Sequence, residues 1–533
     1  MVDTAELPKE EKFLLLDKVF CERHPEYIHK PAKNIRDFID NQFYLNMGSE
    51  CWQTIKDLLT EFEASKKNTA VFEMPPGAGK SYLSSIITAY EIHKISCLKD
   101  PQTELGLARG SNIAVMNMSQ NGLQAKKVVF GEIKARIENS FWFNKFNTLN
   151  QDKKSELDFG RGVVIIPGNS SETNPYGYNL IVVVMDEVAW WEVTKERDYV
   201  KDVYETLEKR MSNRFADKWA WKIVLITNPS YPDRYVEYLI ENPKVFGVRK
   251  SIWEMKPWLF NGELVEWLKY KIPTELLIEA QANPDSFKRD MLGFPSDTLY
   301  PWLVNPNAID KCINVNMNNP VKEGFVLYDE IVKLKHKICN VHIDLGLTGD
   351  AGGFAMTYKE NGKVKVGLLL RFKGSVQSPI KFSDIRQILI ALRDKGIQIA
   401  KISYDGFQSV DSLQILKAQG FEVELLSVDR SLQPYDTLKE LIYDMKIELP
   451  NVNIEKAKFV PETPEEWLYK ELRELEKRES KVDHKPKGSK DMSDALAGSV
   501  YWSIQSEEVN ITGSENTIEG VGTLESNNIF DYK

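Results

Sequence analysis

The chain has 533 residues, of which 42% are hydrophobic, and its formal net charge at pH 7 is −9. This length allows two to four domains, and the negative charge excludes a protein that coats DNA by bulk electrostatic attraction. No apolar run approaches the roughly 20 residues that span a bilayer, and the N-terminus is too charged for a cleavable signal, so we expect a cytosolic protein. The five scattered cysteines lack Cys-x-x-Cys spacing, which favours reduced thiols.

A glycine-rich loop follows a short apolar run and precedes residues with helical periodicity. A strand, loop and helix of this kind can close backbone N–H groups around phosphates, with a lysine on the β and γ phosphates and a hydroxyl on Mg²⁺. Lys80 and Ser81 supply these groups, whereas Met74 stands where the strict pattern has its first glycine. The residues predicted to contact the nucleotide are Pro76, Gly77, Ala78, Gly79, Lys80, Ser81 and Tyr82. An ordinary turn between a strand and a helix is the alternative.

Two later apolar runs end in polar residues that suit the same chemistry. The first predicts a strand buried on both faces of a parallel sheet and ends in Asp186 and Glu187. Because ligands lie at the carboxyl ends of such strands, we expect Asp186 to hold Mg²⁺ and Glu187 to polarise the attacking water. The second run ends in Thr227 and Asn228, whose side chains could sense a γ-phosphate, although Asn-Pro can also simply start a turn.

Three separated aspartates mark the second half of the chain. Asp344 follows alternating apolar residues that predict a strand, with Gly352 and Gly353 in the next hairpin. Asp405 ends another strand, and Asp494 lies among small residues in a predicted helix. Three converging carboxylates would suit a pair of Mg²⁺ or Mn²⁺ ions. Taken singly, each aspartate is an ordinary cap or turn residue, and spacing alone does not establish convergence.

In this order, the motifs resemble those of the large terminase subunit of tailed double-stranded DNA bacteriophages. The loop 76–81 resembles that family's degenerate Walker A motif, 184–187 its Walker B strand and 227–229 its coupling motif. Asp344-Leu345-Gly346, Tyr404-Asp405-Gly406 and the segment 483–498 resemble its nuclease motifs. The likeness extends from about Asn41 to Tyr501.

The resemblance implies an α/β fold with a RecA-like P-loop ATPase domain followed by a ribonuclease H-like nuclease domain. It implies ATP-driven translocation of double-stranded DNA into a procapsid in the host cytoplasm, and metal-dependent cutting of concatemers. ATP and Mg²⁺ are the implied cofactors, with Mn²⁺ possible at the nuclease site. The implied partners are DNA, the portal protein, the small terminase subunit and further copies of the chain in a ring. Glu187, Asp344, Asp405 and Asp494 are then the catalytic residues.

Two residues that the family implies stay open. Four arginines are candidates for its arginine finger, and each can equally be a surface charge: Arg136, Arg161, Arg210 and Arg214. An adenine-contacting segment should precede the phosphate loop. Gln42 and Tyr44 are the candidates there, although an aromatic cluster at that place could equally be core.

The domain boundaries follow from composition and motifs. We predict a helical lead-in over 1–45, the ATPase domain over 46–255, a lid and hinge over 256–324, the nuclease domain over 325–505 and a flexible acidic tail over 506–533. Helices are predicted at 263–271, 273–282, 382–395, 437–446 and 465–479.

Two other classes of protein share these motifs. A helicase- or resolvase-like repair ATPase with a nuclease would carry the same loop and carboxylates, and a non-catalytic assembly remnant would keep them in deviant form. DNA-stimulated ATP hydrolysis excludes the remnant, and binding to a portal ring separates packaging from repair.

Overall fold

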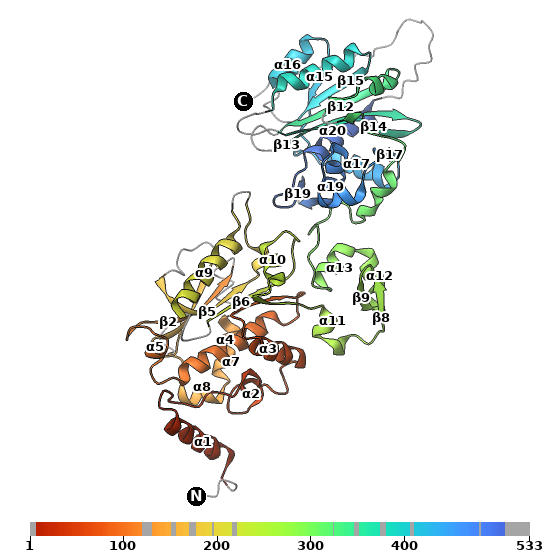
Figure 1. The fold of residues 1–533 in the computed structure, drawn as a ribbon. Helices are drawn as coiled ribbons and strands as arrows, with labels where there is room; N and C mark the ends of the chain where they lie inside the picture. The colour runs from red at the N-terminus through yellow and green to blue at the C-terminus, as the bar shows by residue number, and fades with distance from the viewer. Residues whose placement is uncertain are drawn as a thin grey trace, which may run out of the picture. The chain divides into compact units, whose positions relative to one another are not determined.

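The structure is a computed structural model, which describes residues 7–119, 130–150, 156–169, 177–194, 197–215, 221–322, 325–345, 351–373, 380–405, 410–478 and 481–506. The chain divides into two compact units at Val304/Asn305, with the short segment Lys485–Gly488 grouped with the first. Each unit is built on its own β-sheet (Figure 1). The predicted α/β fold is therefore confirmed. The sequence-based division into a separate lid over 256–324 and a lead-in over 1–45 stays a prediction.

The first unit contains a seven-stranded sheet in the order β3-β4-β2-β5-β6-β1-β7. All neighbouring pairs are parallel except β3 with β4. The strands are β1 (Thr69–Glu73), β2 (Ile113–Ser119), β3 (Leu157–Asp158), β4 (Val163–Asn169), β5 (Asn179–Asp186), β6 (Lys222–Thr227) and β7 (Val245–Arg249). The apolar runs of β1, β5 and β6 are buried because helices cover both faces. The loop strand β1 and the acidic strand β5 are not neighbours, since β6 lies between them.

Helix α4 is the central helix of one face, and almost all of its side chains are buried. It packs on β5 and β6 and against α3 and α7, whereas α9 contacts β5 and α10 contacts β1 and β7 from the other face (Figure 1). The helices of this part are α1 (Lys9–Arg23), α2 (Ile35–Asp40), α3 (Gln53–Ser65), α4 (Lys80–Cys97), α5 (Pro101–Glu104), α7 (Phe130–Glu138), α8 (Phe141–Phe146), α9 (Tyr199–Phe215) and α10 (Tyr235–Glu241).

The chain then continues through short elements within the same unit. They are α11 (Ile252–Met255), β8 (Leu264–Trp267), β9 (Tyr270–Pro273), α12 (Leu277–Ala282) and α13 (Pro284–Asp290). The helix predicted at 263–271 is wrong, because β8 and β9 form an antiparallel hairpin there. Leu268 makes its turn with φ of +53°, a backbone conformation that no glycine announces in the sequence. The later part of the helix predicted at 273–282 is confirmed by α12.

The second unit contains a six-stranded sheet in the order β16-β15-β12-β13-β14-β17. The hairpin pairs β12-β13 and β13-β14 are antiparallel, and the pairs β12-β15, β15-β16 and β14-β17 are parallel. The strands are β12 (Ile338–Leu345), β13 (Ala351–Glu360), β14 (Lys363–Lys373), β15 (Gln398–Tyr404), β16 (Val423–Leu425) and β17 (Ile447–Glu448). Gly352 and Gly353 lie inside β13, which pairs antiparallel with β12, so their predicted place in the hairpin after Asp344 is confirmed.

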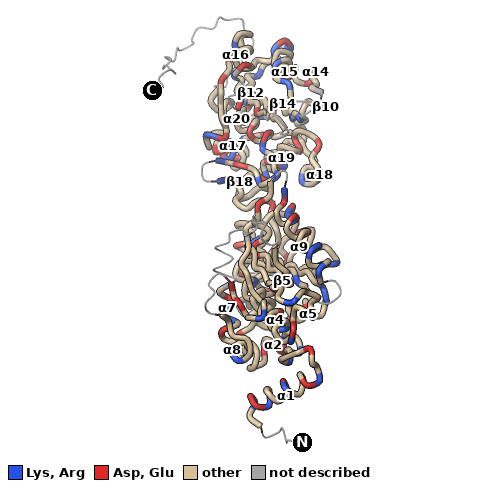
Figure 2. The backbone as a smooth tube through the Cα atoms, turned by 90° about the vertical axis from the view of Figure 1, so that its left-hand side faces the viewer, with Lys and Arg blue, Asp and Glu red and all other residues tan. Residues whose placement is uncertain are grey.

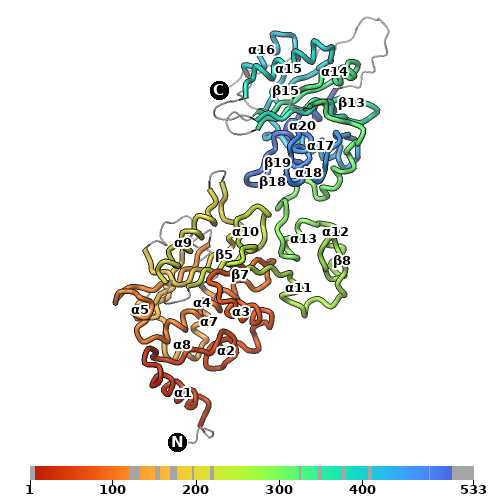
Figure 3. The backbone as a smooth tube through the Cα atoms, viewed as in Figure 1, coloured from red at the N-terminus to blue at the C-terminus, as the bar shows by residue number. Residues whose placement is uncertain are grey.

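Helices cover both faces of this sheet (Figure 1). On one face, apolar residues of α15 pack in the core with β12 and β13. On the other face, α20 packs on β12 and β13, and α17 packs against α20. In Figure 3, α20 lies beside β13 although the two elements are far apart in the sequence. The helices are α14 (Tyr328–Ile331), α15 (Phe382–Asp394), α16 (Val410–Ala418), α17 (Gln433–Tyr443), α18 (Ile454–Phe459), α19 (Pro464–Glu474) and α20 (Asp491–Gln505).

The helices predicted at 382–395 and 437–446 are confirmed in type by α15 and α17. The helix predicted at 465–479 is confirmed only as far as Glu474, where α19 ends. From Leu475 the chain forms β18 (Leu475–Arg478), which pairs with β19 (Lys481–His484). A second small hairpin joins β10 (Val321–Lys322) to β11 (Phe325–Val326).

Basic and acidic residues are both scattered along the traced backbone of each unit, as Figure 2 shows. Within the residues that the structure describes, no helix is both long and apolar enough to cross a membrane.

Candidate functional site

The glycine-rich loop joins the carboxyl end of β1 to the first turn of α4. Gly77 and Gly79 have φ of +74° and +87°, which side chains rarely adopt. A Cβ on Gly79 would also lie 2.9 Å from Ile55 Cδ1 and 3.0 Å from Trp52 Cζ3. Only glycine therefore fits at this turn, and α4 begins at Lys80 with its free backbone N–H groups at the loop.

The Lys80 side chain is buried against the carboxyl ends of the central strands. Its Nζ donates to the carbonyl oxygens of Met74 (3.1 Å) and Pro75 (3.0 Å) and to Oδ1 of Asn228. Burial lowers the pKa of Lys80, and the charges of Glu187 and Asp186 oppose that shift. The lysine, the loop and both acidic residues thus belong to one electrostatic cluster.

Asn228 also holds Glu187. Its backbone N–H donates to Glu187 Oε2 at 3.1 Å and its side-chain Nδ2 donates to Oε1 at 3.0 Å. Glu187 itself has φ of +53° directly after β5, which turns the chain into a short 3₁₀ helix. Asn228 therefore bridges the loop lysine and the second acidic residue, although the three residues come from three different segments.

Asp186 and Thr227 complete the edge formed by β5 and β6. Asp186 is 5% exposed, and burial, followed by the charge of Glu187, raises its pKa to about 6. The hydroxyl of Thr227 accepts from the backbone N–H of Ala189 at 3.0 Å and donates to the carbonyl of Asn228 at 2.9 Å. A carboxylate that burial destabilises as an anion suits a nearby cation, so Asp186 is a residue that could hold a metal ion, and Ser81 lies in the first turn of α4.

The remaining predicted loop residues differ in their surroundings. Pro76 is exposed and Ala78 is buried. Tyr82 lies in the first turn of α4, where the guanidinium of Arg136 is 4.4 Å from its ring centroid. Arg136 also forms an ion pair with Glu132 at 2.7 Å.

The structure brings Trp52, rather than the predicted Tyr44, against the loop. Tyr44 is buried among Phe38 and His93, which is the core alternative, and Gln42 is exposed. Trp52 stands at the start of α3, which precedes β1. A 13-residue helix is about as long as five strand residues plus a turn. The start of α3 therefore returns to the end of β1, a length argument that could have predicted the contact.

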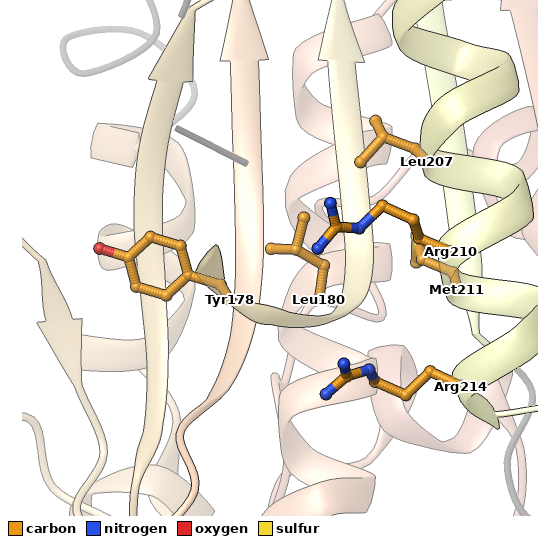
Figure 4. Close-up of a pocket in the computed structure, with 6 residues that line it drawn as sticks. All are labelled: Tyr178, Leu180, Leu207, Arg210, Met211 and Arg214. Atoms are coloured by element: carbon orange, nitrogen blue, oxygen red, sulfur yellow. The ribbon is translucent and has the colours of Figure 1, made fainter. Parts of the chain in front are cut away.

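The other arginine candidates lie away from the loop. Arg161 donates to the carbonyls of Leu98 and Ser96 (2.6 and 2.5 Å), at the C-terminal end of α4. Arg210 and Arg214 extend from α9 into a shallow pocket beside Leu180, at the start of β5 (Figure 4). The acidic residues are at the opposite end of that strand. In the described chain, Arg136 alone of the four candidates contacts a predicted loop residue.

The second unit gathers the three predicted aspartates. Asp344 and Asp405 stand at the carboxyl ends of the parallel neighbours β12 and β15, and the Asp405 N–H donates to the Ile343 carbonyl at 3.1 Å. Asp494 lies in the first turn of α20. Burial, and then the charges of Asp494, Asp491 and Asp405, raise the pKa of Asp344 well above its ordinary value. Mutual repulsion of this kind suits oxygen ligands of a hard divalent cation.

Asp494 has two partners of its own. Lys490 Nζ lies 2.9 Å from Asp494 Oδ2, and the hydroxyl of Tyr435 donates to Oδ1. Burial raises the pKa of Asp494 to about 6, against the opposing charge of Lys490. Lys490 also pairs with Asp429. In the part of the chain that the structure describes, no three acidic, histidine or cysteine side chains are arranged to hold a metal ion. The donor set fits a divalent cation, but its ligating arrangement is not formed.

Two further acidic residues, Asp491 and Glu471, lie near Asp494 at the first turn of α20. The Ser489 hydroxyl lies within hydrogen-bonding distance of both Glu471 (2.7 Å) and Asp491 (2.8 Å), and the backbone N–H of Ser493 donates to Glu471 at 2.9 Å. Burial and the charge of Asp491 raise the pKa of Glu471 to about 8. The Lys-Asp-Met-Ser-Asp sequence signalled Asp491. Nothing local signalled Glu471, which comes from α19.

Comparisons with known proteins first define the class of the first unit. A family model described as the N-terminal P-loop domain of the uncharacterized protein MJ0330 matches residues 32–268. This part of the chain is therefore a P-loop domain, as predicted. No curated protein sequence matches the chain.

Among solved structures, the chain is similar to several phage large terminases. The HK97 bacteriophage large terminase is 10% identical with a TM-score of 0.40, over 88% of this chain and 99% of that one. The large terminase from the thermophilic bacteriophage D6E in complex with ADP is 12% identical with a TM-score of 0.32, over 85% and 98%. The large terminase nuclease from thermophilic phage G20c is 16% identical with a TM-score of 0.28, over 39% and 100%.

Proposed function

We propose that this chain is a DNA-packaging ATPase and nuclease of the large terminase kind. The observation that carries the proposal is the bridge that Asn228 makes between Lys80 and Glu187 at the carboxyl edge of a parallel sheet. Such a site can respond to the presence of a phosphate. The Asn228 side chain contacts both Lys80, which would bind the phosphate, and Glu187, which would polarise the attacking water. Motif order along the chain supports the same function.

In the first unit, the loop glycines and Lys80 bind the phosphates of ATP. Ser81 and Asp186 hold its Mg²⁺, which neutralises charge on the phosphates when bound. Glu187 orients and polarises the water that attacks the γ-phosphate. Asn228 changes partners when the phosphates draw Lys80 away from it. The change reaches β6 through the hydrogen bond from the Thr227 hydroxyl to the Asn228 carbonyl.

In the second unit, Asp344, Asp405 and Asp494 would hold Mg²⁺ or Mn²⁺ at one edge of a sheet that we propose to be ribonuclease H-like. The metal supplies charge stabilisation at the cleaved phosphodiester. Lys490 neutralises Asp494 until the cation binds, since one carboxylate cannot serve both at full strength. Concatemeric double-stranded DNA is the proposed substrate.

The proposed partners are the portal of a procapsid, a small terminase subunit and further copies of the chain in a ring, in the host cytoplasm. The acidic tail 506–533 is the proposed portal-docking segment, and 507–533 lies outside the described residues. Its two aromatics, Phe530 and Tyr532, would anchor and its acids would steer. Deleting 507–533 should abolish packaging and leave ATP hydrolysis and nicking at parental levels. Full packaging by the truncated chain would make the segment a solubilising tail.

The decisive experiment is packaging of DNA into purified procapsids with ATP. The parent chain should protect DNA from nuclease digestion, and Lys80→Ala should not, because the cationic phosphate contact is gone. Lys244→Ala, at an exposed lysine of the same unit, is the matched control and should package normally. DNA-stimulated ATP turnover without portal binding would instead favour a repair ATPase.

A further inference from the structure

A second lysine lies over the phosphate loop. The Nζ of Lys256 is 3.9 Å from the position that a Cβ would take on Gly77. The same ammonium lies 4.9 Å from the ring centroid of Trp52, whose edge contacts Gly79. Lys256 therefore lies beside Gly77, and through Trp52 it is next to Gly79, although it comes from a segment about 180 residues away in the sequence.

The backbone holds Lys256 at this place. Its N–H donates to the carbonyl of Ile252 at 2.8 Å, closing α11. The preceding residue, Met255, is buried, and its carbonyl accepts from the hydroxyl of Thr54 on α3 at 2.9 Å. A capping box between Ser251 and Glu254 starts the same helix. Only the flexible side chain of Lys256 is thus free to change position.

The charge of Lys256 has no anionic partner in the described chain. Its ammonium contacts the ring of Trp52, and no ion pair or hydrogen bond to another described residue engages it. The neighbouring Lys250, by contrast, lies 3.3 Å from Glu254. Two lysines and the positive end of the 18-residue helix α4 therefore meet at one loop. Such a concentration of positive charge favours binding of an anion.

We infer that Lys256 is a second phosphate-binding lysine of the nucleotide site, which donates to the phosphates of ATP from outside the loop. The inference rests on the proposed ATP site. It assigns to Lys256, directly after α11, a direct contact with the nucleotide. Lys80 reaches the phosphates from inside the loop and Lys256 from the side of Gly77, so the phosphates are held between two cations.

The test compares Lys256→Met with Lys250→Met in the full-length protein. Methionine keeps an apolar stem against Trp52 and removes only the charge. Affinities for ATPγS and ADP are measured by titration calorimetry. We expect Lys256→Met to bind ATPγS about tenfold more weakly, the effect of losing one charge-assisted hydrogen bond at a partly exposed site. Lys250→Met should bind as the parent does, and Lys256→Arg should recover most of the lost affinity.

Melting without nucleotide separates a structural role from a binding role. Equal midpoints for Lys256→Met and the parent, with a smaller ATPγS-induced shift in the variant, support the inference. Equal ATPγS affinity in Lys256→Met and Lys250→Met would overturn it while leaving the ATP site intact. If the parent chain itself binds no ATPγS, the proposed function fails together with the inference.

Discussion

The substitution Glu187→Gln tests the site most directly, because both oxygens of this carboxylate have known partners. They accept from the backbone N–H and the side-chain Nδ2 of Asn228, at 3.1 and 3.0 Å. Glutamine offers one carbonyl oxygen and one NH₂ group, so one of these two donors meets another donor. One hydrogen bond to a charged group, about 1.5–3 kcal/mol, is lost at the edge of β6.

The effect on turnover should be much larger than the effect on binding. Loss of a residue that polarises water reduces turnover by roughly 10²–10⁴, which corresponds to about 2.7–5.5 kcal/mol in the activation barrier. ATP affinity should change only a few-fold, because the loop and Lys80 remain. Phosphate release under saturating ATP gives the first quantity and titration calorimetry the second. Glu192→Gln, at an exposed residue five positions on, is the control. A Glu187→Gln protein with parental turnover would reject the assigned role.

Three further predictions probe the two units separately. Because burial raises the pKa of Asp186 from 3.8 to about 6, the native protein binds more protons than the unfolded chain in that window, and stability falls as pH rises through it. Without nucleotide, Asp186→Asn should therefore have a higher melting midpoint than the parent protein at pH 8 and not at pH 4. Equal midpoints at pH 8 would contradict the inference that the buried charge of Asp186 destabilises the fold. Nicking of plasmid DNA with Mn²⁺ should stop, and ATP turnover should be unchanged, in each of the variants Asp344→Asn, Asp405→Asn and Asp494→Asn. Unchanged nicking in a variant would show that its aspartate is not part of the nuclease site. Gly353→Ala should destabilise the second unit by about 1–3 kcal/mol in urea unfolding, because its Cβ would lie 2.0 Å from the backbone oxygen of a residue in α20; an unchanged midpoint would mean that the helix yields freely.

The elements with strong local patterns could be predicted from sequence. The apolar run of β5 and the loop before α4 are such patterns, because burial on both faces and a tight phosphate turn each constrain consecutive residues. The hairpin at 264–273 could not be predicted, since its turn uses Leu268 at positive φ instead of a glycine. The end of α19 at Glu474 was missed for a related reason. Residues 475–478 continue the charged helical pattern but pair with β19.

The candidate sites divide in the same way. Residues at the ends of predicted strands, such as Asp186 and Asp344, could be named because strand ends meet at one sheet edge. Trp52 could have been found from the length of α3, whereas Lys256 could not be named from the sequence, because its place beside the loop depends on how separate segments pack. Glu471 is hidden for the same reason, as it reaches the acidic cluster from another helix. Local pattern thus finds residues at strand ends and misses residues whose position depends on the packing of separate segments.

The close approach of α20 to its sheet has a consequence for exchanging parts between related proteins. A Cβ on Gly353 of β13 would meet the backbone of Asp491, and a Cβ on Gly498 would lie 2.3 Å from the ring of His342 on β12. The helix thus contacts the two strands at two points about two helical turns apart. At both points one partner is a glycine, so no flexible side chain is present that could adjust to a changed distance. In a chimaera that takes α20 from one parent and β12 and β13 from another, the two contacting surfaces come from different proteins. They would therefore not match at these close contacts. In such exchanges, the segments 338–360 and 489–505 should always be taken from the same parent protein.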